Sequence, residues 1–161
     1  MNREEGTGRR SGAMTVAKKT IRLVIEYALL GLPVAVYIDQ NVASFAVVHG
    51  SSMAPTLNAR VDMDRNAKRD VVLLDKWSGE CEPGDIVAMH SPDDPRKDII
   101  KRVSCSPPID LPKGYVWVEG DNPSFSRDSR HFGPVPQALI FGIARAAIYP
   151  TPRQLDLSQN H

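Results

Sequence analysis

The chain has 161 residues, of which 42% are hydrophobic and 24% are charged, and its net charge is +1. This composition is that of a globular protein with one domain of ordinary size, and it excludes a chain that is disordered throughout. A net charge this close to zero provides no general attraction to nucleic acid, so we expect no nucleic-acid partner.

The N-terminal region contains an apolar run that predicts a membrane anchor. Residues 23–38 are largely apolar but are interrupted by Glu26, Gly31 and Pro33. At 16 residues, the run is shorter than the roughly 20 residues that a full span needs. A buried amphipathic helix at the edge of a soluble domain fits the hydropathy equally well. We predict a single membrane-anchor helix over residues 21–43.

A basic tail, residues 1–20, precedes this predicted anchor. Through residue 22 the cations outnumber the anions: Arg3, Arg9, Arg10, Lys18, Lys19 and Arg22 against Glu4 and Glu5. If the anchor spans a membrane, this excess of Lys and Arg holds the N-terminus on the side of synthesis. The domain that follows the anchor then lies on the opposite side.

Short β-rich runs follow, separated by Pro, Gly and Asp. They cover residues 45–48, 71–74, 85–89, 99–103, 115–119 and 140–148. Such spacing is typical of a mostly antiparallel β domain, and the 13 prolines of the chain disfavour long helices after residue 44. We predict a mostly β domain over residues 44–150, an exposed polar loop over 58–70, and a loosely attached C-terminal tail over 151–161.

The two cysteines, Cys81 and Cys105, have neither a C-x-x-C spacing nor a nearby Cys/His ligand pattern. A metal site therefore has little support, and we expect neither a metal nor a cofactor. Free thiols are favoured over a single disulfide.

The segment from Gly50 to Leu57 holds two adjacent serines in a turn-forming sequence, GSSMAPTL. A serine hydroxyl needs a base within hydrogen-bond reach before it can act as a nucleophile. Neither His49 nor His131 has the partner pattern of a Ser-His-Asp triad, and no Gly-x-Ser-x-Gly elbow exists. A histidine-based hydrolase is therefore disfavoured.

Lys101 is the alternative base. In a strand, Ile99, Lys101 and Val103 point to one face, so the lysine lies between two β-branched neighbours. Burial disfavours the ammonium form, and lowering a lysine pKa from about 10.4 to about 7–8 costs about 4 kcal/mol. From this strand alone, a lysine that extends out of an edge strand into solvent is the more common case.

Several segments together resemble the boxes of the type I signal peptidase family, in the family's order and over roughly residues 20 to 150. These segments are Ser52 to Leu57, Gly84 to Val87, Lys101 to Val103, Gly120 to Asn122, and Ser126 to Val135. The resemblance implies a signal-peptidase-like (LexA-like) fold of bent antiparallel sheets and a serine endopeptidase activity. It favours Lys101 as a base over the solvent-exposed alternative.

The resemblance also assigns roles residue by residue. Ser52 is the nucleophile, preferred over Ser51 because the family places the reactive serine directly before the methionine. Lys101 is the general base and Ser126 orients its amine. The resemblance further implies that Asp128 and Arg130 form a structural pair that holds the Ser126 loop.

Other positions near the nucleophile receive lesser roles from the resemblance. Met53 is expected along the substrate cleft, with a core methionine as the alternative. Gly50 stands where some bacterial members carry a serine hydroxyl that donates to the oxyanion, so here the backbone N–H of Ser52 is the candidate donor. We interpret His49 and His131 as bystanders.

Within the family, residues 34–36, 71–77 and 116–121 look most like the mitochondrial inner-membrane branch, and there like the second of its two catalytic subunits. This resemblance implies a single-pass protein of the mitochondrial inner membrane with its catalytic domain in the intermembrane space. It implies as partners the membrane, precursor proteins with cleavable sorting signals, and a sister catalytic subunit that forms a heterodimer with this chain.

The chain departs from the family pattern after Lys101. Residues 104–114 (SCSPPIDLPKG) replace a longer stretch, so about one hairpin is missing and the strand at Lys101 is less well supported. A subunit that stabilises its partner without cutting is one alternative, although the intact Ser52, Lys101 and Ser126 argue against it. A self-cleaving repressor is another, but it needs an N-terminal DNA-binding helix-turn-helix.

Overall fold

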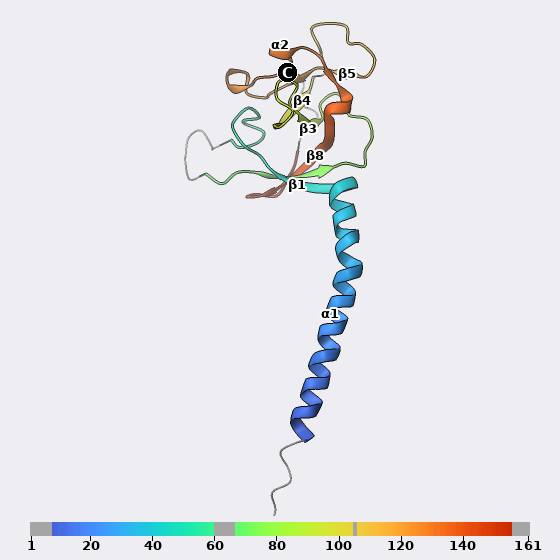
Figure 1. The fold of residues 1–161 in the computed structure, drawn as a ribbon. Coiled ribbons are helices and arrows are strands. Elements are labelled where there is room, and N and C mark those ends of the chain that lie inside the picture. The colour runs from blue at the N-terminus through green and yellow to red at the C-terminus, as the bar shows by residue number, and fades with distance from the viewer. Residues whose placement is uncertain (1–7, 60–66, 105, 156–161) are drawn as a thin grey trace, which may run out of the picture. The chain divides into compact units, whose positions relative to one another are not determined.

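A computed structural model describes residues 8–59, 67–104 and 106–155 of the chain (Figure 1). The chain divides into two compact units, residues 1–39 and residues 40–161. The first unit is helical, and the second contains every strand of the described residues.

Helix α1 (Gly8–Asn41) includes the predicted anchor, although it ends two residues earlier than expected. Its part from Lys18 to Asn41 is long and apolar enough to cross a membrane, by length and composition. These 24 residues extend about 36 Å, compared with a hydrocarbon core of about 30 Å. Pro33 lies inside the helix without ending it. The structure thus contains a candidate membrane span where the anchor is predicted.

The second unit is built on one seven-stranded sheet. Its strands are β1 (Ala43–Val47), β2 (Val71–Asp75), β3 (Ile86–His90), β4 (Asp98–Val103), β6 (Val118–Glu119), β8 (Ile140–Tyr149) and β9 (Arg153–Gln154). The order is β1-β2-β8-β3-β4-β6, with β9 also on β8, and every pairing is antiparallel. The predicted strand at 115–119 is split at Trp117, because β5 (Tyr115–Val116) pairs with β7 (Val135–Pro136) in a separate sheet.

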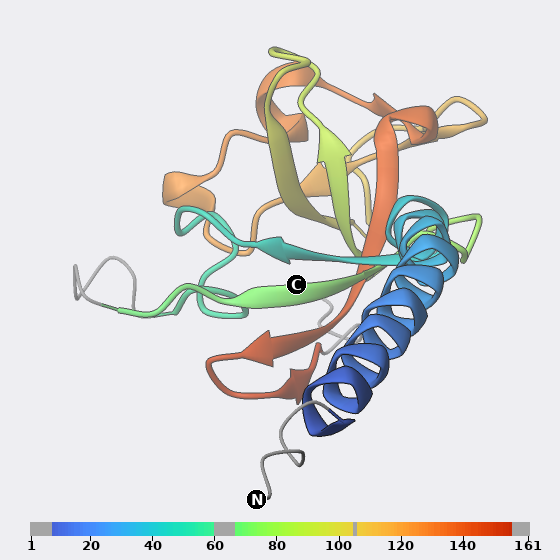
Figure 2. The ribbon, with the colours of Figure 1, turned by 60° about the horizontal axis from the view of Figure 1, so that its bottom comes forward.

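Strand β8 joins the two halves of the sheet. One end of it pairs with β2 and β9, and the other end pairs with β3 (Figure 2). Within the stretch that pairs with β2 the register shifts twice, as expected for a strand that bends. The predicted bent antiparallel architecture is confirmed.

The remaining described elements are short: η1 (Pro123–Phe125), α2 (Ser129–Phe132) and η2 (Gln137–Leu139). They lie within residues 123–139, a stretch that includes the last family segment, Ser126 to Val135. The expectation that no long helix follows residue 44 holds for the described residues.

Two apolar clusters flank β3, which is buried on both faces. Ile86 and Ala88 belong to one cluster, whereas Val87 and Met89 belong to the other. Successive strand residues point to opposite faces, so a continuous apolar run is what a central strand requires. Strand β4 lies directly beside β3 and is held in place by this double core.

Three sequence expectations need correction. The loop predicted over 58–70 is exposed only in part, because Asn58 and Asp70 at its ends are 3% and 5% exposed. The predicted tail 151–161 is not loosely attached where the structure describes it, since β9 pairs with β8 and Leu155 lies in the core. The strand at Lys101 is well supported despite the short 104–114 connection, because β4 pairs with both β3 and β6.

The cysteine prediction is answered only in part. Cys81 is a free thiol. Cys105 lies outside the described residues.

Candidate active site

The predicted nucleophile lies in a tight turn that follows β1. The amide of Ala54 donates to the carbonyl of Ser51 at 3.0 Å, and the amide of Leu57 donates to that of Met53 at 2.7 Å. Ser51 is only 7% exposed, whereas Ser52 is half-buried and faces a cleft. The placement therefore agrees with the preference for Ser52 over Ser51.

Asn58 holds this turn from its C-terminal side. Its Nδ2 donates to the carbonyls of Val48 and Gly50, both at 2.9 Å, and its Oδ1 accepts from the amide of Asp70 at 2.8 Å. Asn58 has φ = 56°, a left-handed conformation that Asn tolerates better than most residues. The sequence analysis missed this role, and the only local signal was an Asn directly after the turn.

Lys101 reaches the same cleft from β4. It pairs in register with Val87 of β3 and is 3% exposed, so the predicted burial of this lysine is observed. Burial lowers the pKa of Lys101 below its ordinary value of 10.5; the Asp128 carboxylate opposes this shift, and the Arg130 guanidinium adds to it. A neutral amine, which can accept a proton, is therefore favoured more than for a lysine in water.

Ser126 and Asp128 form a buried pair close to the nucleophile turn. The Oγ of Ser126 donates to Asp128 Oδ2 at 2.6 Å, and the amide of Gly120 donates to the same oxygen at 3.0 Å. Asp128 is fully buried and also accepts from Arg130, whose Nε lies 2.8 Å from Oδ1. The predicted Asp128 and Arg130 pair therefore exists, and it holds the Ser126 hydroxyl in one orientation.

Several forces act on the charge of Asp128. Burial raises the pKa of this carboxyl, but hydrogen bonds from Arg130, Ser126 and Gly120 together lower it well below its ordinary value. Asp128 also caps α2, where its side chain accepts from the amide of Arg130 and the His131 side chain faces its backbone. His131 thus takes part in a capping box, which is a structural role outside the chemistry.

The nucleophile turn and the Ser126 segment touch through Gly120. The amide of Asn122 donates to the carbonyl of Ser52 at 3.0 Å. A Cβ placed on Gly120 would lie 2.2 Å from Ser126 Oγ and 2.5 Å from the Ser52 carbonyl oxygen. Only glycine permits this approach, which explains the residue type at this position.

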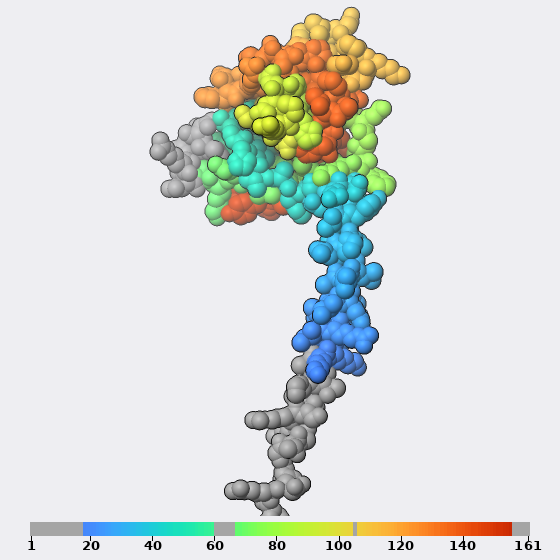
Figure 3. All heavy atoms as spheres, in the orientation of Figure 1, coloured from blue at the N-terminus to red at the C-terminus, as the bar shows by residue number. Residues whose placement is uncertain are grey.

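The cleft that contains Ser52 and Lys101 has a volume of about 470 Å³. Its walls come from β1 and β4, and Val72, Leu74 and Ala88 supply apolar lining. Figure 3 shows the protein as spheres, with the turn between β3 and β4 (yellow) visible on the face shown. Ser52 and Lys101 thus line the same cleft from two different segments of the chain.

Some predicted residues lie elsewhere. Met53 is 1% exposed and belongs to the core cluster, so the structure supports the core alternative rather than a place along the cleft. Gly50 is exposed with φ = 77° and does not line the cleft, whereas the neighbouring His49 does.

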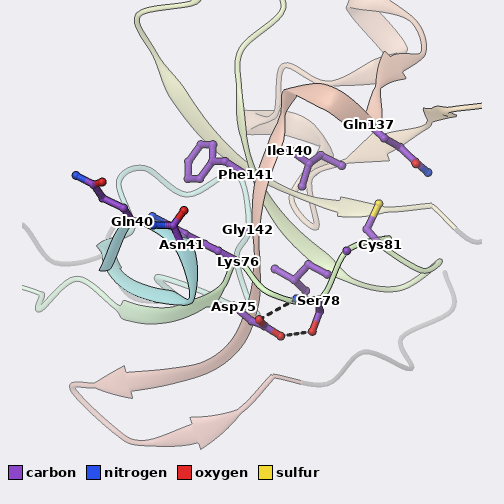
Figure 4. Close-up of a pocket in the computed structure, with 12 residues that line it drawn as sticks. Gln40, Asn41, Asp75, Lys76, Ser78, Cys81, Gln137, Ile140, Phe141 and Gly142 are labelled. Carbon is purple, nitrogen blue, oxygen red and sulfur yellow. Dashed lines mark hydrogen bonds between the residues drawn. The ribbon is translucent and has the colours of Figure 1, made fainter. Parts of the chain in front are cut away.

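A second cavity, of about 330 Å³, contains none of the predicted site residues. It is lined mainly by polar groups near the end of α1 and the loop after β2, where Asp75 accepts hydrogen bonds from Ser78 (Figure 4). Gln40 and Asn41 lie on one side of it, and Gln137 and Cys81 lie on the other. The cavity shares only Phe141 with the Ser52 cleft.

Comparison with known families agrees with this geometry. The model of the signal peptidase family, peptidase S26, matches residues 21–109 and 104–149. The chain belongs to this family, and it is a peptidase of the signal-peptidase type. The two matched stretches meet at the short connection after β4, where the sequence analysis found about one hairpin missing.

Curated relatives specify the branch of the family. Subunit 2 of the mitochondrial inner membrane protease of Schizosaccharomyces pombe is 36% identical over 137 residues, or 77% of this chain and 74% of that protein. The mouse subunit 2 is 35% identical over 152 residues, or 85% of each chain. The mitochondrial ATP-independent inner membrane protease subunit 1a of Arabidopsis thaliana is 37% identical over 132 residues, or 70% of this chain and 74% of that protein. The resemblance to the second subunit type is confirmed.

The close approach at Gly120 predicts that Gly120→Ala destabilises the domain. The added Cβ forces either Ser126 or the Ser52 backbone to move, at a cost of about 1–3 kcal/mol. Thermal unfolding measures the loss. Gly79→Ala is the matched control, because a Cβ there meets nothing within 4 Å. Equal unfolding temperatures for the two variants would contradict the proposed contact.

The lowered pKa of Asp128 predicts how stability depends on pH. The charged carboxylate stabilises the folded state fully above its unfolded pKa of 3.8, and this contribution is lost as the pH falls below that value toward the lower folded pKa. Asp128→Asn should therefore be less stable than the native protein at pH 7 and should lose less stability on acidification to about pH 2.

Unfolding temperatures between pH 2 and 7 test this expectation. Asp93→Asn is the control, because Asp93 pairs with Arg127 in an exposed ion pair of little net value. A native protein whose stability does not change below pH 4 would rule out the proposed role of Asp128.

Proposed function

We propose that this chain is a membrane-anchored serine endopeptidase that removes sorting signals from proteins delivered to the mitochondrial intermembrane space. Ser52 is the nucleophile and Lys101 is the general base. The observation that carries the proposal is the burial of Lys101 in the same cleft as the half-buried Ser52. The names of the relatives, all inner membrane proteases of mitochondria, support the proposed location.

Ser126 orients the base in this proposal. Its hydroxyl hydrogen is donated to Asp128, so the oxygen of Ser126 remains free to accept an N–H of the lysine amine. That contact turns the nitrogen lone pair toward Ser52 when substrate closes the cleft. The Asp128 and Arg130 pair fixes the direction of the Ser126 hydroxyl.

Acylation begins when the Oγ of Ser52 attacks the carbonyl carbon of the scissile peptide bond while Lys101 Nζ takes the hydroxyl proton. The oxyanion that forms accepts a hydrogen bond from the backbone N–H of Ser52. Collapse of the tetrahedral intermediate breaks the C–N bond, and Lys101 returns the proton to the leaving amine. The product is an ester of Ser52 with the sorting signal.

Deacylation uses the same groups. Lys101 takes a proton from water, whose oxygen attacks the ester carbonyl, and the second tetrahedral intermediate collapses to a free carboxyl end. The proton returns to the Oγ of Ser52. No metal or cofactor takes part in either half of this reaction.

The walls of the cleft fit an extended peptide. Within the described residues, β1 pairs only with β2, and residues 98–101 of β4 pair only with β3, so each strand leaves one edge open. A substrate strand can pair with such edges through its backbone. The apolar lining from Val72, Leu74 and Ala88 favours small apolar side chains next to the scissile bond.

The orientation follows from the charges that flank α1. Lys18, Lys19 and Arg22 lie at the N-terminal end of the candidate span, and basic residues favour the inner side of a membrane, which for the mitochondrial inner membrane is the matrix. The N-terminus is then in the matrix, and the sheet domain is in the intermembrane space. A sister subunit of the subunit 1 type is the proposed partner, and the two form a heterodimer.

The assignment of the nucleophile predicts that Ser52→Ala and Lys101→Met abolish processing of sorting-signal precursors. A loss of more than about 1,000-fold is expected, because removing a nucleophile or its base alone removes most of the catalysis. Complementation of cells that lack the native protein, followed by the precursor-to-mature ratio, measures the effect.

Ser51→Ala is the matched control for this experiment, because Ser51 is adjacent, buried and outside the cleft. It should process precursors normally. Processing by either Ser52→Ala or Lys101→Met would sink the proposed mechanism. Loss of partner assembly along with processing in these variants would favour a stabilising role instead.

The lowered pKa of Lys101 predicts an activity that rises with pH. Below this pKa the ammonium has no lone pair, so kcat/KM falls toward zero, with its midpoint below 10.5. Lys101→Arg should be inactive at every pH, because a guanidinium stays protonated. An activity that increases as the pH falls would exclude Lys101 as the base.

A stability measurement accompanies this pH profile. Between the lowered folded pKa and 10.5, the unfolded chain binds more protons at Lys101 than the folded protein, so the stability of the native protein rises with pH across that range. Lys101→Met lacks this dependence and should unfold at a higher temperature at pH 7. Calorimetry of both proteins gives the difference.

A further inference from the structure

Arg153, on β9, contacts the back of the nucleophile turn although it lies far away in the sequence. Its Nη2 donates to the carbonyl of Thr56 at 3.0 Å and to Asp70 Oδ2 at 2.7 Å. Its Nη1 lies 3.4 Å from Asp70 Oδ1, so the arginine holds both oxygens of that carboxylate. The family match ends at residue 149, so nothing in that match assigns a role to Arg153.

Asp70 transmits this contact to Asn58. Asp70 Oδ2 accepts from the amide of Asn58 at 2.7 Å, while the amide of Asp70 donates back to Asn58 Oδ1 at 2.8 Å. The carbonyl of Asp70 also accepts from the amide of Val48 at 2.8 Å. Both residues are nearly fully buried, so these bonds are protected from competition with water.

Asn58, Asp70 and Arg153, called the brace below, together hold the turn on both sides of Ser52. Through Asn58 the brace binds the carbonyls of Val48 and Gly50, and through Arg153 it binds that of Thr56. None of its three residues lines the Ser52 cleft. The brace therefore touches the backbone that carries the nucleophile but not the substrate.

We propose that the brace is a positioning device for the nucleophile, and that Arg153 is its essential cation. This inference rests on the proposed function, because it assigns the turn a catalytic serine. A nucleophile misplaced by about 1 Å can lose about 100-fold in rate. Without Arg153 the buried Asp70 carboxylate loses its cation, and the turn loses one of the three carbonyl contacts that fix it.

The chain offers a closely matched control in Arg145. The Arg145 and Arg153 side chains are 37% and 36% exposed, and each pairs with a carboxylate at another strand or turn. Arg145 contacts Asp75 at 3.3 Å and Asp85 at 3.4 Å but makes no hydrogen bond to the nucleophile turn. Arg153→Gln and Arg145→Gln thus remove the same charge from equally exposed sites.

The first experiment measures steady-state cleavage of a fluorogenic sorting-signal peptide by the full chain in detergent micelles. Arg153→Gln should lower kcat by about 10-fold or more with KM changed by less than about 2-fold, because the cleft walls are unaltered. Its pH midpoint should match that of the native protein, since Lys101 is untouched. Arg145→Gln should keep the native kcat.

The second experiment reads the turn without activity. Hydrogen exchange should accelerate at the amides of Ala54 and Leu57 in Arg153→Gln but not in Arg145→Gln, since these amides hydrogen-bond within the turn. Asn58→Asp, which removes the two donors to Val48 and Gly50, should give the same pattern. Activity of the double variant gives a further check. In Asn58→Asp/Arg153→Gln, kcat should fall by no more than the product of the two single fold-decreases, because both substitutions act through one turn.

A native kcat in Arg153→Gln would overturn the proposed role of the brace. The same conclusion would follow if kcat fell equally in both arginine variants, in parallel with their unfolding temperatures. Unchanged exchange at Ala54 and Leu57 would overturn that role as well. Failure of the proposed function is a different result, in which the native chain does not cleave the peptide at all. In that case the exchange measurements still decide whether the brace holds the turn.

Discussion

A buried ion pair between Arg102 and Asp121 connects the segments that carry the proposed chemistry. The Nε and Nη2 of Arg102 donate to the two carboxylate oxygens of Asp121 at 2.9 and 2.8 Å, and Nη1 donates to the carbonyl of Gly84 at 2.9 Å. A buried pair of this kind is stable only when its donors find partners, and here they come from several chain segments. Because Arg102 directly follows Lys101 on β4, strand alternation turns one side chain into this network and the other into the cleft.

The surroundings of Lys101 balance two opposing demands. Burial favours the neutral amine, yet the serine that is proposed to orient this amine is held by a carboxylate, Asp128, that favours the ammonium. Arg130 resolves the conflict, because its guanidinium pairs with Asp128 and itself disfavours a second positive charge. The pair thus acts on Lys101 as well as on the Ser126 loop, which extends the structural role implied by the resemblance.

Two separate parts of the chain fix the backbone of the nucleophile turn. On one side, the segment at Gly120 approaches the Ser52 carbonyl so closely that no side chain fits between them. On the other side, Asn58 and Arg153 hold carbonyls before and after Ser52. A hydroxyl that must meet a lysine from a different strand needs such support, because catalytic geometry tolerates only small errors.

The sequence by itself predicted the main strands and the apolar helix, because these depend on local periodicity, and its short motifs led through the family resemblance to the two residues of the proposed dyad. It also indicated Asp128 and Arg130, which are neighbours in the chain. Only the tertiary structure decided that Met53 packs in the core and that Arg153 contacts a turn 97 residues earlier. Contacts between residues so far apart in the chain produce no periodic pattern in the sequence. They depend on how β8 bends and on how the chain returns through β9.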